Sequence, residues 1–153
     1  MTLADLLRPE YVQLRPVATS RDAAIREIAA VLENDVKVLD WEEMHRRVTA
    51  SAPSVAEPGA SFCMCLPHAR TAAVTDMVMS AGRFDPGLRI ANVKQPVRYL
   101  FCIAVPPEMA TDYLRIIGLL ARIVKDPDSE TQIHTAATPE DLIETLARLE
   151  AKL

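Results

Sequence analysis

Strand-like apolar runs alternate with amphipathic helical segments along this chain, and the order predicts an α/β fold with helices packed on a sheet. The chain has 153 residues, of which 50% are apolar and 25% charged, as in ordinary globular domains. It contains neither an internal repeat nor a linker long enough to divide it. We therefore expect one domain spanning residues 1–153.

The first 35 residues predict a helical turn, a short strand and a longer helix. The turn falls at 2–7, where Pro9 limits its extension, and the strand falls at 11–14. Thr19 or Ser20 can cap the longer helix. Its apolar residues recur at helical spacing and share one face: Ile25, Ile28, Ala29 and Leu32.

A second helix is expected to begin after Asp40, because Glu43 follows three residues later as in a capping box. Three apolar residues are expected to share one side of it: Trp41, Met44 and Val48. Residues 49–61 are rich in Ser, Ala, Pro and Gly, a composition that predicts a loop.

Three apolar segments are the strand candidates in the middle of the chain. The first is 63–68, which follows the loop, and the second is 74–80. The third, 97–105, is nearly continuous in apolar residues and includes β-branched and aromatic side chains. We expect it to be a buried central strand.

The C-terminal third predicts helices. The first is expected after Pro106 and Pro107, capped by Thr111 and ending near Lys125. Its predicted inward residues are Leu114, Ile117, Leu120, Ala121 and Val124. A short helix is expected at 132–136. The last is expected to begin at Thr138 with a proline at its first position. Its inward residues are Leu142, Leu146 and Leu149.

Charge and hydropathy exclude several classes of protein. A formal net charge of −4 with scattered basic residues argues against nucleic-acid binding. The apolar runs are too short to span a bilayer, and the N-terminus lacks the pattern of a signal peptide. We therefore expect a cytoplasmic protein without direct membrane insertion, whose three cysteines are reduced thiols.

The densest cluster of reactive side chains is Cys63-Met64-Cys65-Leu66-Pro67-His68-Ala69-Arg70. Cys63, Cys65 and His68 together suggest zinc, but a fourth ligand would have to come from Cys102 or elsewhere, and structural zinc pairs usually have Cys-x-x-Cys spacing. Buried core cysteines are the favoured alternative. A catalytic Cys65 activated by His68 is disfavoured, because along a strand the two side chains lie roughly 10 Å apart on opposite faces.

His68 is also a candidate nucleophile. A neutral imidazole is abundant near pH 7 and can attack phosphorus without an activating base. The transferring phosphoryl group then needs donors around it, and Arg70, Arg46 and Arg47 are candidates. The alternative is a histidine that merely ends a strand.

The segment 63–70 resembles the active-site signature of the fructose/mannitol-type EIIA domains of the bacterial phosphotransferase system, in which an aliphatic run precedes Pro-His, Gly or Ala, and a basic residue. The resemblance extends over the whole chain in the order of its helices and strands. It implies a mixed sheet of about five strands with helices on both faces. It implies no cofactor and no metal.

The same resemblance implies a phosphotransferase component with a phosphohistidine intermediate. In this family the histidine after the proline, here His68, accepts a phosphoryl group on Nε2 from the phosphocarrier HPr. The group then passes to a cysteine of an EIIB domain that serves sugar transport. In the nitrogen-regulatory branch, the phosphorylation state instead signals to a regulatory target protein.

Three features depart from the family pattern: the arginine, the loop and the second histidine. Arg47 is the best match to the arginine that contacts the phosphoryl group, although Arg46 is adjacent and residues 51–61 look like an insertion. Pro58 and Cys63 stand where the family tends to have Thr and Gly. Tyr113 stands where it usually has a second histidine. Tyrosine can donate a hydrogen bond to a phosphoryl oxygen but is not a cation at neutral pH.

Two functional hypotheses follow. The first is a working phosphoryl carrier in which His68 is phosphorylated, Arg47 neutralises charge, and Arg70 and Tyr113 assist. The second is an EIIA-like regulatory binding module that is not phosphorylated. A chain of this length without fused EIIB or permease segments leans toward regulation.

Overall fold

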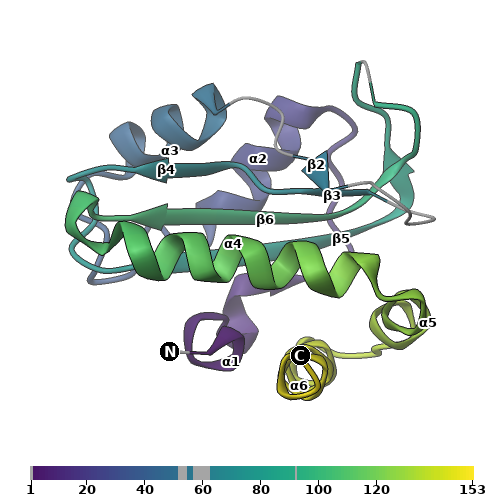
Figure 1. The fold of residues 1–153 in the computed structure, drawn as a ribbon. Helices are drawn as coiled ribbons and strands as arrows, with labels where there is room; N and C mark the ends of the chain where they lie inside the picture. The colour runs from purple at the N-terminus through teal and green to yellow at the C-terminus, as the bar shows by residue number, and fades with distance from the viewer. Residues whose placement is uncertain (1, 52–54, 57–62, 92) are drawn as a thin grey trace.

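The computed structural model places a sheet between helices that cover both of its faces (Figure 1). It describes residues 2–51, 55–56, 63–91 and 93–153. Helices α2 (Arg21–Ala30) and α3 (Trp41–Ala50) lie over one face, and α4 (Ala110–Lys125) lies along the other. The predicted α/β arrangement is confirmed.

The sheet is mixed, with the strand order β1-β5-β6-β3-β2 and with β4 also paired to β6. The strands are β1 (Val12–Gln13), β2 (Val55–Ala56), β3 (Cys63–Cys65), β4 (His68–Arg70), β5 (Val78–Leu88) and β6 (Val97–Val105). Strands β3 and β4 follow one another along the same side of β6, parallel to it. Six strands therefore occupy five positions, as expected.

Strand β6 is the centre of the sheet, as its apolar sequence predicted. Eight of its nine residues are buried, Arg98 being the exception. It pairs antiparallel with β5 on one side and parallel with β3 and β4 on the other. A strand buried on both faces reads as a continuous apolar run because no position faces water.

The strand predicted at 74–80 is displaced in the structure. Val74 forms only an isolated bridge with Val38, and β5 instead runs from Val78 to Leu88. Its second half includes glycine and proline residues that ordinarily end strands, but pairing with β6 carries it onward with a register shift between Arg83 and Leu88. Long-range pairing overrides local propensity here.

Helix α4 corrects two predictions. It follows a 3-10 turn (Pro107–Met109) and begins at Ala110, with Met109 rather than Thr111 at its N-cap. Its buried residues are Tyr113, Ile116, Leu119, Leu120, Ile123 and Val124. Leu114, predicted to face the core, is 65% exposed. Two adjacent apolar stripes satisfy helical spacing, and contact with the sheet selects between them.

Three further helices begin at their predicted caps. The side chains of Ser20, Asp40 and Thr138 accept hydrogen bonds from backbone amides at the starts of α2, α3 and α6 (Pro139–Ala151). The expected inward leucines of α6 are buried. Helix α1 (Leu3–Leu6) and a 3-10 turn (Pro9–Tyr11) precede β1, so the predicted strand at 11–14 is shorter than expected.

Helix α5 (Pro127–His134) begins five residues before the short helix predicted at 132–136. Most of the predicted loop at 49–61, with Pro58, lies outside the described residues. Within the described part of the chain, no helix is both long enough and apolar enough to cross a membrane.

Candidate functional site

His68 is the first residue of β4, and its ring has one nitrogen engaged by the backbone. The ring Nδ1 lies 2.6 Å from the carbonyl oxygen of Leu66. A carbonyl oxygen can only accept, so Nδ1 carries the proton and donates it. The neutral ring then has its lone pair on Nε2. Local geometry at the Leu66-Pro67-His68 turn therefore leaves Nε2 as the ring nitrogen with a free lone pair.

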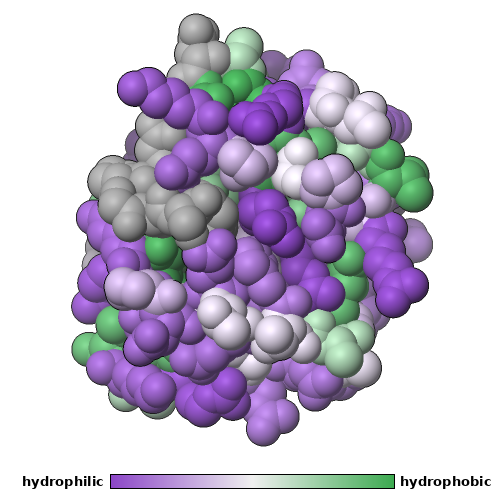
Figure 2. Space-filling model, turned by 90° about the vertical axis from the view of Figure 1, so that its right-hand side faces the viewer, coloured by the Kyte–Doolittle hydropathy of each residue, from purple (hydrophilic) through white to green (hydrophobic). Residues whose placement is uncertain are grey.

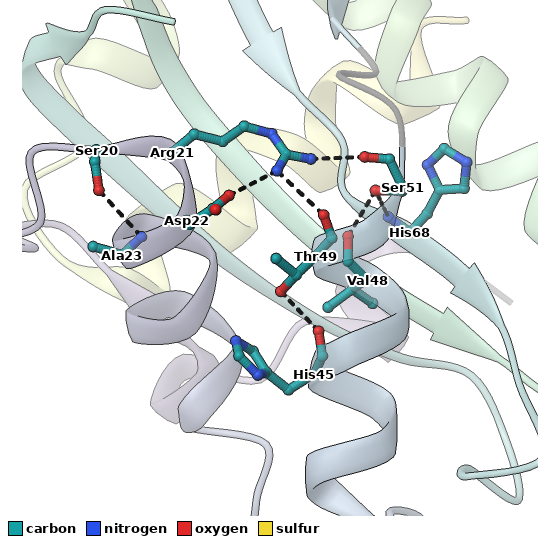
Figure 3. Close-up of polar contacts among 9 residues, drawn as sticks. All are labelled: Ser20, Arg21, Asp22, Ala23, His45, Val48, Thr49, Ser51 and His68. Carbon is teal, nitrogen blue, oxygen red and sulfur yellow. Dashed lines mark hydrogen bonds and ion pairs between the residues drawn. The ribbon is translucent and has the colours of Figure 1, made fainter.

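Ser51 fixes the backbone of His68 from the neighbouring layer (Figure 3). It directly follows α3, and its hydroxyl donates to the carbonyl of Val48 at 2.7 Å. The same oxygen accepts the backbone N–H of His68 at 3.3 Å. The end of α3 is thereby joined to the start of β4.

Arg21 supports this junction from α2 (Figure 3). Its guanidinium donates to the carbonyl oxygens of Ser51 at 2.8 Å and Thr49 at 3.2 Å, which the end of the helix would otherwise leave without partners. The side chain is 19% exposed and also pairs with the exposed Asp22. Sequence analysis missed both Arg21 and Ser51, because no local pattern connects positions 21, 51 and 68.

The His68 pocket is a cavity of about 480 Å³ between β4 and the start of α4. Its lining residues are Ser51, His68, Ala69, Arg70, Ala110, Tyr113 and Leu114. The rings of His68 and Tyr113 lie 5.4 Å apart between centroids and are tilted by 50°. The structure thus brings three of the predicted site residues together: His68, Arg70 and Tyr113.

The Tyr113 hydroxyl remains a hydrogen-bond donor at neutral pH. Burial raises the pKa of Tyr113, and the positive charge of Arg70 offsets this only in part. Arg70 is exposed, at the open side of the pocket. A neutral donor and an exposed cation therefore line the pocket beside the imidazole.

The structure does not bring Arg47 into the His68 pocket. Its Nε donates to Glu43 at 2.9 Å, and its side chain is 53% exposed. Arg46 donates twice to the same carboxylate. Together the two arginines lower the pKa of Glu43 to about 2. The carboxylate predicted to complete a capping box is thus engaged by arginines, and the phosphoryl contact of Arg47 stays a prediction.

The three cysteines are free and buried, which confirms their interpretation as core residues. Burial raises the pKa of Cys65 and of Cys102, so the reactive thiolate is disfavoured in both. In the part of the chain that the structure describes, no group of three or more His, Cys, Asp or Glu side chains is arranged to hold a metal ion.

Comparison with known families assigns this chain to one class of protein. Residues 5–149 match the family described as "Phosphoenolpyruvate-dependent sugar phosphotransferase system, EIIA 2". The chain belongs to this family of EIIA-type proteins.

Two curated relatives carry fructose-specific names. The fructose-specific EIIA component of Haloferax volcanii is 25% identical over 141 residues, which cover 92% of this chain and 91% of the relative. The fructose-specific EIIABC component of Bacillus subtilis is 21% identical over 147 residues, 95% of this chain. The matched part makes up 23% of that relative's length.

Solved structures share the fold. The nitrogen regulatory protein IIA-Ntr from Neisseria meningitidis superposes with a TM-score of 0.82 at 18% identity, covering 94% of this chain and 98% of that one. The enzyme IIAMTL from Escherichia coli, in its complex with phosphorylated enzyme IIBMTL, gives 0.70 at 16% identity, covering 94% and 99%. The predicted fold and family are thereby confirmed.

Proposed function

We propose that this chain is a phosphoryl carrier that accepts a phosphoryl group from HPr on Nε2 of His68 and transfers it to a second protein. The observation that carries the proposal is the 2.6 Å contact between Nδ1 and the Leu66 carbonyl. It holds the ring in the tautomer whose Nε2 is free to attack. Exchange with HPr places the carrier in the cytoplasm.

The transfer step needs no proton movement. The Nε2 lone pair of His68 forms the new N–P bond while the N–P bond of the donor phosphohistidine breaks, and its electron pair returns to the donor imidazole. The phosphorylated ring of His68 gains positive charge and keeps its Nδ1 proton. The Leu66 carbonyl then accepts a stronger, charge-assisted hydrogen bond.

Charge on the phosphoryl oxygens is balanced by residues around the pocket. Arg70 supplies a cation from the exposed side, and the Tyr113 hydroxyl supplies a neutral donor. Arg47 assists if its side chain turns away from Glu43, a rotation that its 53% exposure permits. Ser51 holds the His68 backbone so that the ring presents Nε2 in a constant direction.

The proposed acceptor is a cysteine of an EIIB domain or, in the nitrogen-regulatory branch, a target protein that reads the phosphorylation state. The fructose-specific names of both curated relatives and the IIAMTL–IIBMTL complex support the first. The similarity to IIA-Ntr from Neisseria meningitidis supports the second.

The test is to incubate the purified chain with phosphoenolpyruvate, enzyme I and HPr from the same organism, and to record its intact mass before and after acid treatment. We expect one acid-labile phosphate on the natural chain and none on a His68→Ala variant. His45→Ala is the matched control, because it removes a histidine outside the pocket.

Absence of phosphate on the natural chain would overturn the carrier proposal and leave the regulatory binding module. Two observations would agree with that outcome: Arg47 is paired with Glu43, and Tyr113 stands where the family usually has a histidine. Phosphate on both His68→Ala and the natural chain would place the acceptor elsewhere.

A further inference from the structure

A second cavity lies toward the opposite end of the sheet from His68. On β6, His68 is paired with Ile103, whereas Arg83 of β5 is paired with Tyr99, four residues nearer the start of the strand. At the usual rise per residue, the two pairs are roughly 13 Å apart along the strand. The cavity, of about 400 Å³, includes Arg15, Arg83 and Arg98 in its lining. We call it the arginine cavity.

Two of these arginines are held in place by backbone carbonyls. Nη1 of Arg83 donates to Ala136 at 2.7 Å, to Ile133 at 3.0 Å and to His134 at 3.3 Å. Nε of Arg98 donates to the Phe84 carbonyl at 2.9 Å, and the Arg98 side chain is 24% exposed. Carbonyl groups orient a guanidinium without cancelling its charge, so the cavity has cations in fixed positions.

Positive charge exceeds negative charge in the lining. Asp85 is its one carboxylate among the described residues, and it lies 3.7 Å from Arg98 with an 80% exposed side chain. Within the described ranges, no ion pair is formed by Arg15 or Arg83. Three arginines against one aspartate leave two positive charges, in a chain whose net charge is −4. This end of the molecule presents a largely hydrophilic face (Figure 2).

His134 completes the polar lining with a fixed ring. Its Nδ1 lies 2.6 Å from the Tyr99 hydroxyl, and the two rings stack at 5.3 Å. Burial, followed by the charge of Arg98, lowers the pKa of His134 and favours the neutral ring at pH 7. The histidine therefore lines the cavity without adding charge, and its ring signals report on what enters.

We propose that the arginine cavity binds a small dianion whose charge is carried by oxyanion groups, at a site separate from His68. Planar guanidinium groups match the oxygens of phosphate and carboxylate groups. The cavity volume falls in the range of small-molecule sites. A phosphate monoester and a dicarboxylate share this chemistry, and the test separates them.

The three histidines of the chain provide the experiment, because each lies in a different place. His134 lines the arginine cavity, His68 lines the other pocket, and His45 lies on α3. The full ¹⁵N-labelled chain is titrated with glycerol phosphate, and separately with succinate, at constant ionic strength and pH. We expect saturable shifts of the His134 ring signals, with a dissociation constant of about 1 mM or tighter for one ligand, and unchanged His45 signals.

Variants distinguish a site from general attraction of anions. Arg15→Gln and Arg98→Gln are expected to weaken binding about 10- to 100-fold each, the effect of losing one charge-assisted hydrogen bond. Arg122→Gln on α4 is the matched control, since it removes the same charge from an exposed position outside the cavity. Arg83 is left intact because three carbonyls depend on it.

Linear His134 shifts without saturation for both ligands, or equal weakening by Arg122→Gln, would overturn the proposal. Saturation by glycerol phosphate alone identifies a phosphate monoester, and saturation by succinate alone identifies a dicarboxylate. None of these readouts requires phosphorylation of His68, so this inference and the proposed carrier function fail independently.

Discussion

The two ends of β6 hold positive charge in different ways. Beside His68, the only pocket-lining cation among the described residues is Arg70, on an exposed side chain, and the remaining rim includes Ala69, Ala110 and Leu114. In the arginine cavity three guanidinium groups line one space, and backbone carbonyls fix two of them. One end has a histidine with little fixed charge around it. The other has fixed charge around a histidine whose Nδ1 lies within hydrogen-bond distance of the Tyr99 hydroxyl.

The difference agrees with the two proposed tasks. A carrier has to release what it receives, so strong fixed attraction for the phosphoryl group would slow the onward transfer. A reversible binding site instead gains affinity from donors that are already oriented before the ligand arrives. Substitutions at the two ends test whether the sites act separately and which residues support phosphoryl transfer at His68.

His68→Ala has the largest expected effect on phosphorylation, at one end of β6, and no expected effect on dianion binding at the other end. We expect complete loss of acid-labile phosphate, because the attacking nitrogen is removed, with unchanged His134 shifts on titration with the dianion. Intact mass and the histidine spectra measure the two ends in the same sample. Loss of dianion binding in this variant would show that the sites are coupled.

Arg47→Gln tests whether a cation outside the His68 pocket contacts the phosphoryl group on His68. If Arg47 leaves Glu43 to contact the phosphoryl group, its loss should slow phosphorylation by about 10- to 100-fold, the worth of one charge-assisted hydrogen bond. Arg46→Gln is the matched control, because it also removes an arginine that donates to the Glu43 carboxylate. Initial phosphorylation rates are compared, and similar rates for the two variants would exclude the predicted contact.

Arg21→Met tests whether the hydrogen bonds that Arg21 donates to Thr49 and Ser51 stabilise the fold. The carbonyls of Thr49 and Ser51 lose a partly buried donor, so we expect the free energy of unfolding to fall by about 1–3 kcal/mol. Arg26→Met, on the same helix with a 57% exposed side chain, should change it by less than about 0.5 kcal/mol. Urea unfolding measures both. Equal stability of the two variants would contradict a stabilising role for the hydrogen bonds from Arg21 to Thr49 and Ser51.

Ser51→Ala is expected to act more locally. The His68 amide loses its acceptor and the Val48 carbonyl loses a donor, at a cost of about 0.5–1.5 kcal/mol. Hydrogen exchange of the His68 amide should become faster, whereas Ser51→Thr should preserve its protection because the hydroxyl is retained. Unchanged exchange in Ser51→Ala would mean that strand pairing alone fixes the residue.

Tyr113→Phe has the smallest expected effect. It keeps the ring beside His68 and removes a neutral donor, so phosphorylation should slow about two- to tenfold. A raised folded-state pKa keeps the hydroxyl protonated as pH rises, so the rate ratio of natural chain to variant should be constant from about pH 6 to 9. A ratio that falls within this range would show ionisation at Tyr113.

Local chemistry explains which parts of the fold were predictable. Caps such as Asp40 and Thr138 act on amides three residues away, and the apolar run of β6 reports burial on both faces. The extent of β5 was not predictable, because its second half contains strand-breaking residues that only the neighbouring strand sustains. A short stretch of sequence therefore predicts reliably only the contacts that its own residues make with one another.

In the candidate site too, the local contacts were predictable and the long-range contacts were not. The Leu66-Pro67-His68 turn that frees Nε2 is local, and the sequence alone singled out His68 together with Arg70. The partnership of His68 with Ser51 spans 17 residues, and that of Arg21 with Ser51 spans 30. Arg47 was matched by local context, whereas the structure pairs it with Glu43 one helical turn earlier.

The sequence by itself determined the α/β class, the central strand and the family resemblance, because each depends on residue order within a short segment. It placed His68 at the end of a strand over 63–68, whereas the structure ends β3 at Cys65 and begins β4 at His68. Only the tertiary structure decided which stripe of α4 faces the sheet, which side chains support His68, and that distant arginines line one cavity. Those outcomes depend on packing between segments far apart in the chain, which periodicity does not encode.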